Sequence, residues 1–181
     1  MNITTIHFFN LLLCSGILVL LLASIVALFV LFIGPKKNVY LDFIDKHYLT
    51  LGFLIALSAS LFSLVYSEII GYVPCYLCWY QRVFIFPLVF IFGMAIWHKD
   101  RKVVKYTLPL LCVGFVFSIY QNFKYYFVDT GNLPCDASGA ACYQTFIPEF
   151  GGYIQIPTLA LIVFLSLLAV VLVAHFYKKE D

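Results

Sequence analysis

Residues 71–82 read GYVPCYLCWYQR and lie where two long apolar runs, about Leu49–Ile70 and Trp79–Trp97, meet. Each run has the length, roughly 17 to 25 residues, that a helix needs to cross a bilayer. The stretch that joins them carries two cysteines and an arginine. It therefore predicts two membrane-spanning helices with a tight connection, which brings reactive side chains to the lipid boundary.

Three further apolar runs extend this pattern to the rest of the chain: Phe8–Ile33, Tyr106–Phe123 and Tyr153–Phe176. The 181 residues are 64% hydrophobic and 11% charged, whereas a soluble domain usually carries about 25% charged residues. The first run is too long for a signal peptide, and residues 1–7 hold no Lys or Arg. We therefore expect an all-α integral membrane protein with five spans, the first of them retained.

The basic residues predict how the five spans are oriented. Lysines and arginines concentrate in three segments, residues 34–48, 98–105 and the C-terminal tail, which fall on one side of a five-span chain. Cytoplasmic loops carry such an excess, so we expect the N-terminus outside and the C-terminus in the cytoplasm. Nine of the 11 basic residues lie in these segments: Lys36, Lys37, Lys46, Lys99, Arg101, Lys102, Lys105, Lys178 and Lys179.

The six cysteines divide by their place along the chain. Cys14 and Cys112 lie within apolar spans, where cysteine behaves as a small hydrophobe. The other four lie in the two connections on the opposite side from the lysines, in a compartment where disulfides form and persist. These four are Cys75, Cys78, Cys135 and Cys142. They form the strongest local signal in the chain.

Three interpretations of the four cysteines compete: structural disulfides that hold the loops, a zinc or iron–sulfur site, and disulfides that are exchanged during turnover. The spacing of Cys75 and Cys78 at the start of a helix favours exchange, because the helix dipole stabilises a thiolate there. Arg82 lies four residues after Cys78, on the same helical face. Its cation would stabilise a thiolate or an anionic ligand, unless it simply extends to the lipid headgroups.

The second cysteine pair, in NLPCDASGAACYQ, lies in a loop of turn-forming residues that another protein could reach.

Other residues are weaker candidates. Gln81 precedes Arg82 and points to a different helical face, and Pro157 suits the first turn of the last helix. There is no phosphate-binding loop, hydrolase triad or basic patch that would indicate nucleic acid.

The stretch SEIIGYVPCYLCWYQRVFIFPL, residues 67–88, closely resembles the DsbB/BdbC family of disulfide-bond formation proteins, most closely the BdbC type. The segments YTLPLLCVGFVFSIY and IQIPTLALIVF, and the cysteine pair between them, are similar to the same family in the same order. The resemblance covers roughly residues 49–176. It implies a four-helix bundle core in residues 49–181, with residues 1–48 as an additional N-terminal transmembrane helix and a cytoplasmic linker.

The resemblance also implies a function. Such proteins reoxidise an extracytoplasmic thioredoxin-like thiol oxidase (DsbA/BdbD-like) and pass the electrons to a quinone, ubiquinone or menaquinone, in the bacterial cytoplasmic (inner) membrane. It implies that Cys135 receives the partner's thiolate, that Cys142 then pairs with Cys75, and that Cys78 faces the quinone. Arg82 would hold the quinone ring. Two other functions stay open: a structural or metal-binding membrane protein with disulfide-stapled loops, and a vitamin K epoxide reductase-like enzyme.

Overall fold

The computed structural model describes residues 3–34, 38–127 and 154–177, and this part of the chain is helical without strands. Its helices are α1 (Ile3–Ile33), α2 (Val39–Leu64), α3 (Tyr76–His98), α4 (Val103–Phe127) and α5 (Ile156–Phe176), with a π-helix, η1 (Val65–Ile69), after α2. All five α-helices are long and apolar enough to cross a membrane. The predicted all-α protein with five spans is therefore confirmed.

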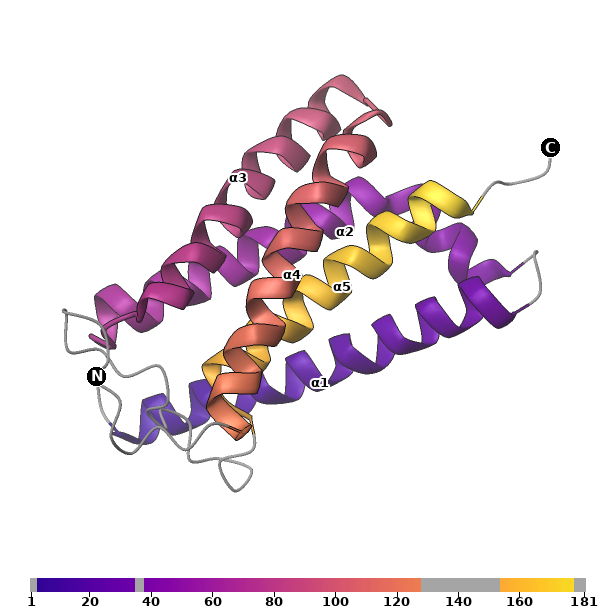
Figure 1. Ribbon diagram of the computed structural model, residues 1–181. Helices are drawn as coiled ribbons and strands as arrows, with labels where there is room; N and C mark the ends of the chain where they lie inside the picture. The colour runs from indigo at the N-terminus through magenta and orange to yellow at the C-terminus, as the bar shows by residue number, and fades with distance from the viewer. Residues whose placement is uncertain (1–2, 35–37, 128–153, 178–181) are drawn as a thin grey trace.

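Helix α5 lies at the centre of the bundle, as Figure 1 shows. It packs against α1, α2 and α4, and α3 completes the bundle by packing on α2 and α4. The sequence of α5 is apolar on every side, as expected of a helix that other helices surround. Helix α1 packs mainly on α5 and touches α2 far less.

Helix α2 starts at Val39, well before the predicted span at Leu49, so the expectation that residues 34–48 form a connection is wrong from residue 39 onward. Asn38 caps this helix, because its side chain accepts a hydrogen bond from the Tyr40 N–H at 2.9 Å. The negative charge of Asp42 in the first turn interacts favourably with the positive end of the helix dipole. The residues that this early part buries share one face: Leu41, Ile44 and Tyr48. The predicted division of the chain at residue 48 stays a prediction, and it would fall within α2.

The connection between α2 and α3 starts with the π-helix η1. The Tyr72 N–H donates to the Tyr66 carbonyl at 2.9 Å. Gly71, between them, has φ = +86°, a left-handed conformation that glycine adopts without steric cost. These features turn the chain sharply, so that α3 begins directly after Cys75.

Helices α4 and α5 approach closely at Gly114. A Cβ atom at this position would lie 2.3 Å from the ring of Phe164. Small residues at such crossings let helices pack closely in membranes, where there is little hydrophobic force between helices. Hydrogen bonds between helices add to this packing: the Asn122 amide donates to the Pro157 carbonyl at 2.8 Å, and Ser24 donates to Ser166 at 2.8 Å.

The two ends of the bundle differ in charge. At one end, Arg101 forms an ion pair with Asp45 and lies over the ring of Tyr48, 5.4 Å from its centroid. Lys99, Lys102 and Lys105 surround the connection between α3 and α4 at this same end. Cys75 and Cys78 begin α3 and so lie at the opposite end. The described part of the basic segments is thus separated from the cysteines by the length of the bundle.

Candidate functional site

Cys75 and Cys78 lie together at the N-terminus of α3. Cys75 is the N-cap residue and is buried, and Cys78 lies in the first turn and is half-buried. Their Sγ atoms are 3.3 Å apart, within contact distance. The first N–H groups of a helix have no intrahelical partners and create a positive potential that favours an anion. This potential would stabilise a thiolate at either position.

A buried amide lies against both sulfurs. The Nε2 of Gln121, from α4, donates to Cys78 Sγ at 3.3 Å and to Cys75 Sγ at 3.5 Å. The Oε1 of Gln121 accepts a hydrogen bond from Gln81 Nε2 at 2.7 Å, which orients the amide with its N–H groups toward the sulfurs. Gln81 also donates to Ser118 Oγ at 3.2 Å. This network of side chains from α3 and α4 fixes a donor where thiolate charge would form.

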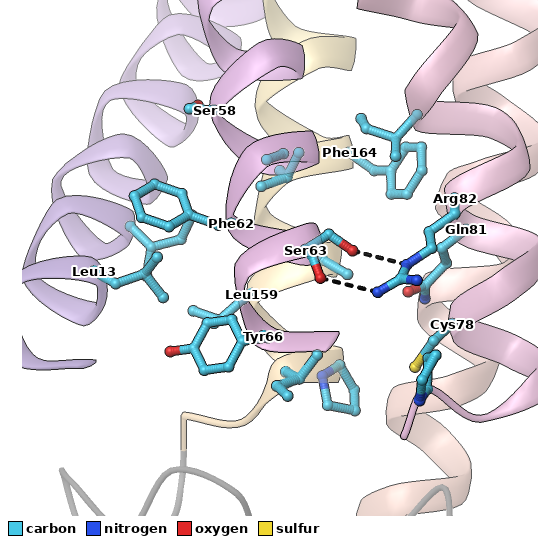
Figure 2. Close-up of a pocket in the computed structure, with 18 of the residues that line it drawn as sticks. Leu13, Ser58, Phe62, Ser63, Tyr66, Cys78, Gln81, Arg82, Leu159 and Phe164 are labelled. Atoms are coloured by element: carbon cyan, nitrogen blue, oxygen red, sulfur yellow. Dashed lines mark hydrogen bonds between the residues drawn. The ribbon is translucent and has the colours of Figure 1, made fainter. Parts of the chain in front are cut away.

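One interpretation of the sequence is that Arg82 extends to the lipid headgroups. The structure instead places this side chain inside the bundle. Its side chain is 8% exposed. Its Nε donates to Ser63 Oγ and its Nη2 to the Ser63 carbonyl, both at 2.9 Å (Figure 2). The guanidinium also lies 5.3 Å from the centroid of the Trp79 ring.

Arg82 forms no ion pair within the described residues: its hydrogen bonds go to the Ser63 hydroxyl and carbonyl, and the carboxylate of Glu68 in η1 acts on its charge from beyond ion-pair distance. A buried cation without a direct ion pair is costly in a membrane span, and such residues mark functional sites. The π-helix η1 begins two residues after Ser63, and π-helical turns are frequent at functional sites. The buried charge of Arg82 beside a π-helical turn therefore marks this region as a candidate functional site.

These polar groups open onto one cavity of about 600 Å³. Its walls come from all five α-helices and are mostly apolar, and side chains around it are shown in Figure 2. Pockets of roughly 300–1,000 Å³ with apolar walls and a few convergent polar groups are typical of small-molecule sites. The polar groups at this cavity are Cys75, Cys78, Gln81, Arg82 and Gln121, with hydroxyl groups from η1 and the end of α2.

The structure brings together three of the five site residues that the sequence indicated: Cys75, Cys78 and Arg82. The other two, Cys135 and Cys142, lie outside the described residues. Cys14 is buried in α1 and Cys112 is exposed on α4, and neither lines the cavity. Pro157 lies in the first turn of α5, as expected.

Gln81 faces α4 while Arg82 faces α2, which agrees with the expectation of different faces. Both nevertheless line the cavity. Sequence reasoning missed Gln121 and Ser63 altogether. A polar amide within an apolar span is a signal in itself. However, its contact with cysteines 43 and 46 positions away depends on how α3 and α4 pack.

Comparison with known proteins agrees with this geometry. Residues 45–174 match the family described as "Disulfide bond formation protein DsbB". "Probable disulfide formation protein C 2" of Bacillus anthracis is 33% identical over 138 residues, which cover 76% of this chain and 97% of that protein. "Disulfide bond formation protein C" of Bacillus subtilis (strain 168) is 39% identical over 134 residues, or 74% of this chain and 96% of that protein. No solved structure matches this chain.

The matched residues begin within α2 and end within α5. They therefore contain both cysteines of the cavity, Arg82 and Gln121, whereas α1 precedes them. The relatives are named for disulfide formation, which is the chemistry that two adjacent thiols at a helix N-terminus can perform. The chain thus belongs to the DsbB family of disulfide bond formation proteins.

Proposed function

We propose that this multi-pass membrane protein is a thiol:quinone oxidoreductase. It reoxidises a thioredoxin-like thiol oxidase outside the cytoplasm and passes the electrons to a membrane quinone. One observation carries the proposal: the sulfur of Cys78, the amide of Gln121 and the guanidinium of Arg82 all open onto the same apolar cavity. That cavity lies where a water-soluble protein and a lipid-soluble oxidant can both approach.

The residues at the cavity fit a quinone. A quinone has a polar head with two carbonyl oxygens and commonly an apolar tail, and the cavity has donors near Cys78 and apolar walls elsewhere. When bound, the quinone accepts the two electrons and two protons that two thiols lose on forming a disulfide. Arg82 would hold the head and offset negative charge on its oxygens, since an electrostatic contact is strong in a site without water.

The cysteines at α3 would face this acceptor. The helix N-terminus and the Gln121 N–H groups would hold Cys78 as a thiolate. We further propose that Cys135 accepts the partner's thiolate and that Cys142 then pairs with Cys75. Thiol–disulfide exchange alone moves disulfides without creating new ones, so an external acceptor is required.

The proposed orientation follows from the charges. The lysine-rich end of the bundle would face the cytoplasm of a bacterial cell, and Cys75 and Cys78 would lie at the extracytoplasmic end of the cytoplasmic membrane. Outside the cytoplasm, a disulfide-forming protein would meet the thiols that it oxidises. The headgroup of the acceptor, whether ubiquinone or menaquinone, makes no difference to this arrangement.

The test uses the purified full chain in detergent, a reduced thioredoxin-like dithiol protein and a soluble quinone. We expect quinone absorbance to fall as the thiols of the dithiol protein disappear, two thiols for each quinone. Cys78→Ser should abolish both changes. Cys112→Ser is the matched control, because Cys112 is exposed on α4 away from the cavity, and it should leave both unchanged.

The competing function, a protein whose loops are only stapled by disulfides, makes the opposite prediction. In that case the parental chain would consume neither thiols nor quinone, and its cysteines would keep one oxidation state when quinone is added. Alkylation of free thiols followed by mass spectrometry distinguishes the two. Constant alkylation with and without quinone would refute the proposed oxidoreductase.

A further inference from the structure

We propose that α1 and α2 form a side opening of the cavity that binds the apolar tail of the acceptor, an inference that rests on the proposed function. The ligand is a quinone with an isoprenoid tail: its head lies near Cys78 and Arg82, and its tail leaves the bundle between α1 and α2. Four residues form the rim of this opening, two from each helix: Leu12, Gly16, Leu54 and Ser58.

The rim residues line the cavity and are also exposed at the molecular surface. Leu12 is 59% exposed and Leu54 is 54% exposed, and Gly16 and Ser58 are exposed as well. A residue that both lines a cavity and reaches the surface marks where the cavity opens. This surface belongs to membrane-spanning segments, so the opening leads into lipid, where an isoprenoid chain resides.

The loose contact between α1 and α2 explains why an opening forms at this place. Helix α1 packs mainly on α5 and touches α2 far less. Gly16 leaves room in the opening, since a Cβ atom built there would meet no atom of another helix within 4 Å. The hydroxyl of Ser58 donates to the Ile55 carbonyl at 3.0 Å. It therefore presents no unpaired polar group to a hydrocarbon chain.

Helix α1 is held in place on either side of the opening. The Tyr66 hydroxyl donates to Asn10 Oδ1 at 2.7 Å, which ties α1 to the π-helix beside the cysteines. Further along α1, Ser24 and Ser166 are joined by a hydrogen bond of 2.8 Å. Buried polar contacts between membrane helices fix their relative position. The two rim residues of α1 are therefore held at fixed positions relative to the rest of the bundle.

The contribution of α1 to this opening lies outside the part of the chain that the family match covers. The family match begins at residue 45 and so does not include α1. The alignment with the Bacillus anthracis relative leaves only 3% of that protein uncovered, too little for a helix of 31 residues. The tail-binding role that we assign to α1 thus adds to what the four matched helices provide.

The experiment measures binding, independently of turnover, by the quenching of Trp79 fluorescence. Trp79 lies beside Arg82, and the other of the two tryptophans, Trp97, is replaced by Phe in every protein tested. The full chain in detergent is titrated with two quinones that share one headgroup, one with a long isoprenoid tail and one without a tail. Gly16→Phe on α1 and Ser58→Phe on α2 narrow the opening from opposite sides.

We expect each narrowing variant to weaken binding of the long-tailed quinone about tenfold, as loss of burial of roughly two methylene groups would do. Binding of the tailless quinone should stay within about twofold. The matched controls are Val19→Phe on α1 and Leu61→Phe on α2. Both positions are exposed but do not line the cavity, so these controls should bind both quinones like the parental chain.

Two results would overturn the tail site alone: unchanged affinity for the long-tailed quinone in both narrowing variants, or an equal loss for both quinones. A parental chain that binds neither quinone would overturn the proposed function, and the tail site with it. Thermal unfolding of each variant establishes that it is folded. Because the variants lie on different helices, misfolding of one leaves the other to decide.

Discussion

At the scale of single residues, the Gln121 amide donates hydrogen bonds to both sulfurs. Gln121→Leu keeps the size of this side chain but removes its two N–H donors. We expect Cys78, in the reduced protein, to react about tenfold more slowly with a small alkylating reagent. A hydrogen bond to a charged group contributes roughly 1.5 kcal/mol or more, and its loss disfavours the reactive thiolate.

Ser118→Ala is the control for this change. Ser118 is buried in the same network and accepts a hydrogen bond from Gln81. Its own hydroxyl donates to the Gly114 carbonyl and not to a sulfur. Alkylation of Cys78 should therefore stay close to the parental rate. Equal slowing in both variants would mean that the network acts through packing, and Gln121 would lose its assigned role as a donor.

Arg82 is the second residue whose role can be tested. Arg82→Met keeps the apolar stem and removes the charge and the donors, so we expect KM for the quinone to rise roughly ten- to a hundredfold. Arg82→Lys should be intermediate, since Lys keeps the charge but cannot reproduce the planar pair of contacts with Ser63. Steady-state kinetics at varied quinone concentration gives the comparison.

The other arginine of the chain, Arg101, provides the matched control for that experiment. It lies at the opposite end of the bundle, paired with Asp45. Arg101→Met removes the same charge from the protein without touching the cavity, and KM should not change. If Arg82→Met also leaves KM and kcat unchanged, the quinone head must bind elsewhere.

These residues differ in how far the sequence alone could identify them. Cys75, Cys78 and Arg82 lie within eight positions of one another, so helical periodicity was enough to place them on one site. Gln121 and Ser63 come from α4 and α2, and only the packing of these helices on α3 brings them to the sulfurs and the guanidinium. Periodicity within one helix carries no information about such contacts.

At the scale of elements, the apolar runs predicted the five spans because each run is long and nearly uncharged. The start of α2 was missed because its first turns are amphipathic: the charged Asp42, Asp45 and Lys46 alternate with the buried residues and resemble a polar connection. The π-helix η1 was missed too, because no composition signal distinguishes it from the helix it extends.

The contact between α4 and α5 yields a prediction at this scale. Gly114→Ala should lower the apparent midpoint of thermal unfolding in detergent, because the added Cβ would lie 2.3 Å from the Phe164 ring. Overpacking of this kind costs typically 1–3 kcal/mol, roughly. Phe164→Leu in the same chain should recover part of the loss, since the smaller side chain vacates the space.

A second helical glycine, Gly93, is the control. A Cβ atom there would lie 3.4 Å from Phe53, an ordinary contact. Gly93→Ala should therefore leave the midpoint unchanged or raise it slightly, because alanine favours helix over glycine by roughly 1 kcal/mol. A similar loss at both positions would show that helix packing is insensitive to the clash at Phe164.

At the scale of the whole molecule, the bundle separates two kinds of chemistry along its axis. Lys99, Lys102, Lys105 and the ion pair of Arg101 with Asp45 lie at one end of the described chain. Cys75 with its partners lies at the other end, together with Arg82 and Lys124. The cavity reaches from these cysteines into the helices. In the proposed function, an acceptor dissolved in lipid and a donor dissolved in water would reach the same pair of sulfurs from different directions.

This arrangement predicts which side of the membrane each end occupies. The positive-inside rule places the basic end in the cytoplasm, so both cysteine pairs should be extracytoplasmic. In intact cells, brief treatment with a membrane-impermeant reductant should make these cysteines reactive toward a membrane-impermeant maleimide. A reporter at the other end, Lys102→Cys in a chain whose loop cysteines are Ser, should react only after the membrane is permeabilised. The reverse pattern, with the reporter labelled and the native pairs protected, would invert the proposed orientation and leave the thiols facing a reducing compartment.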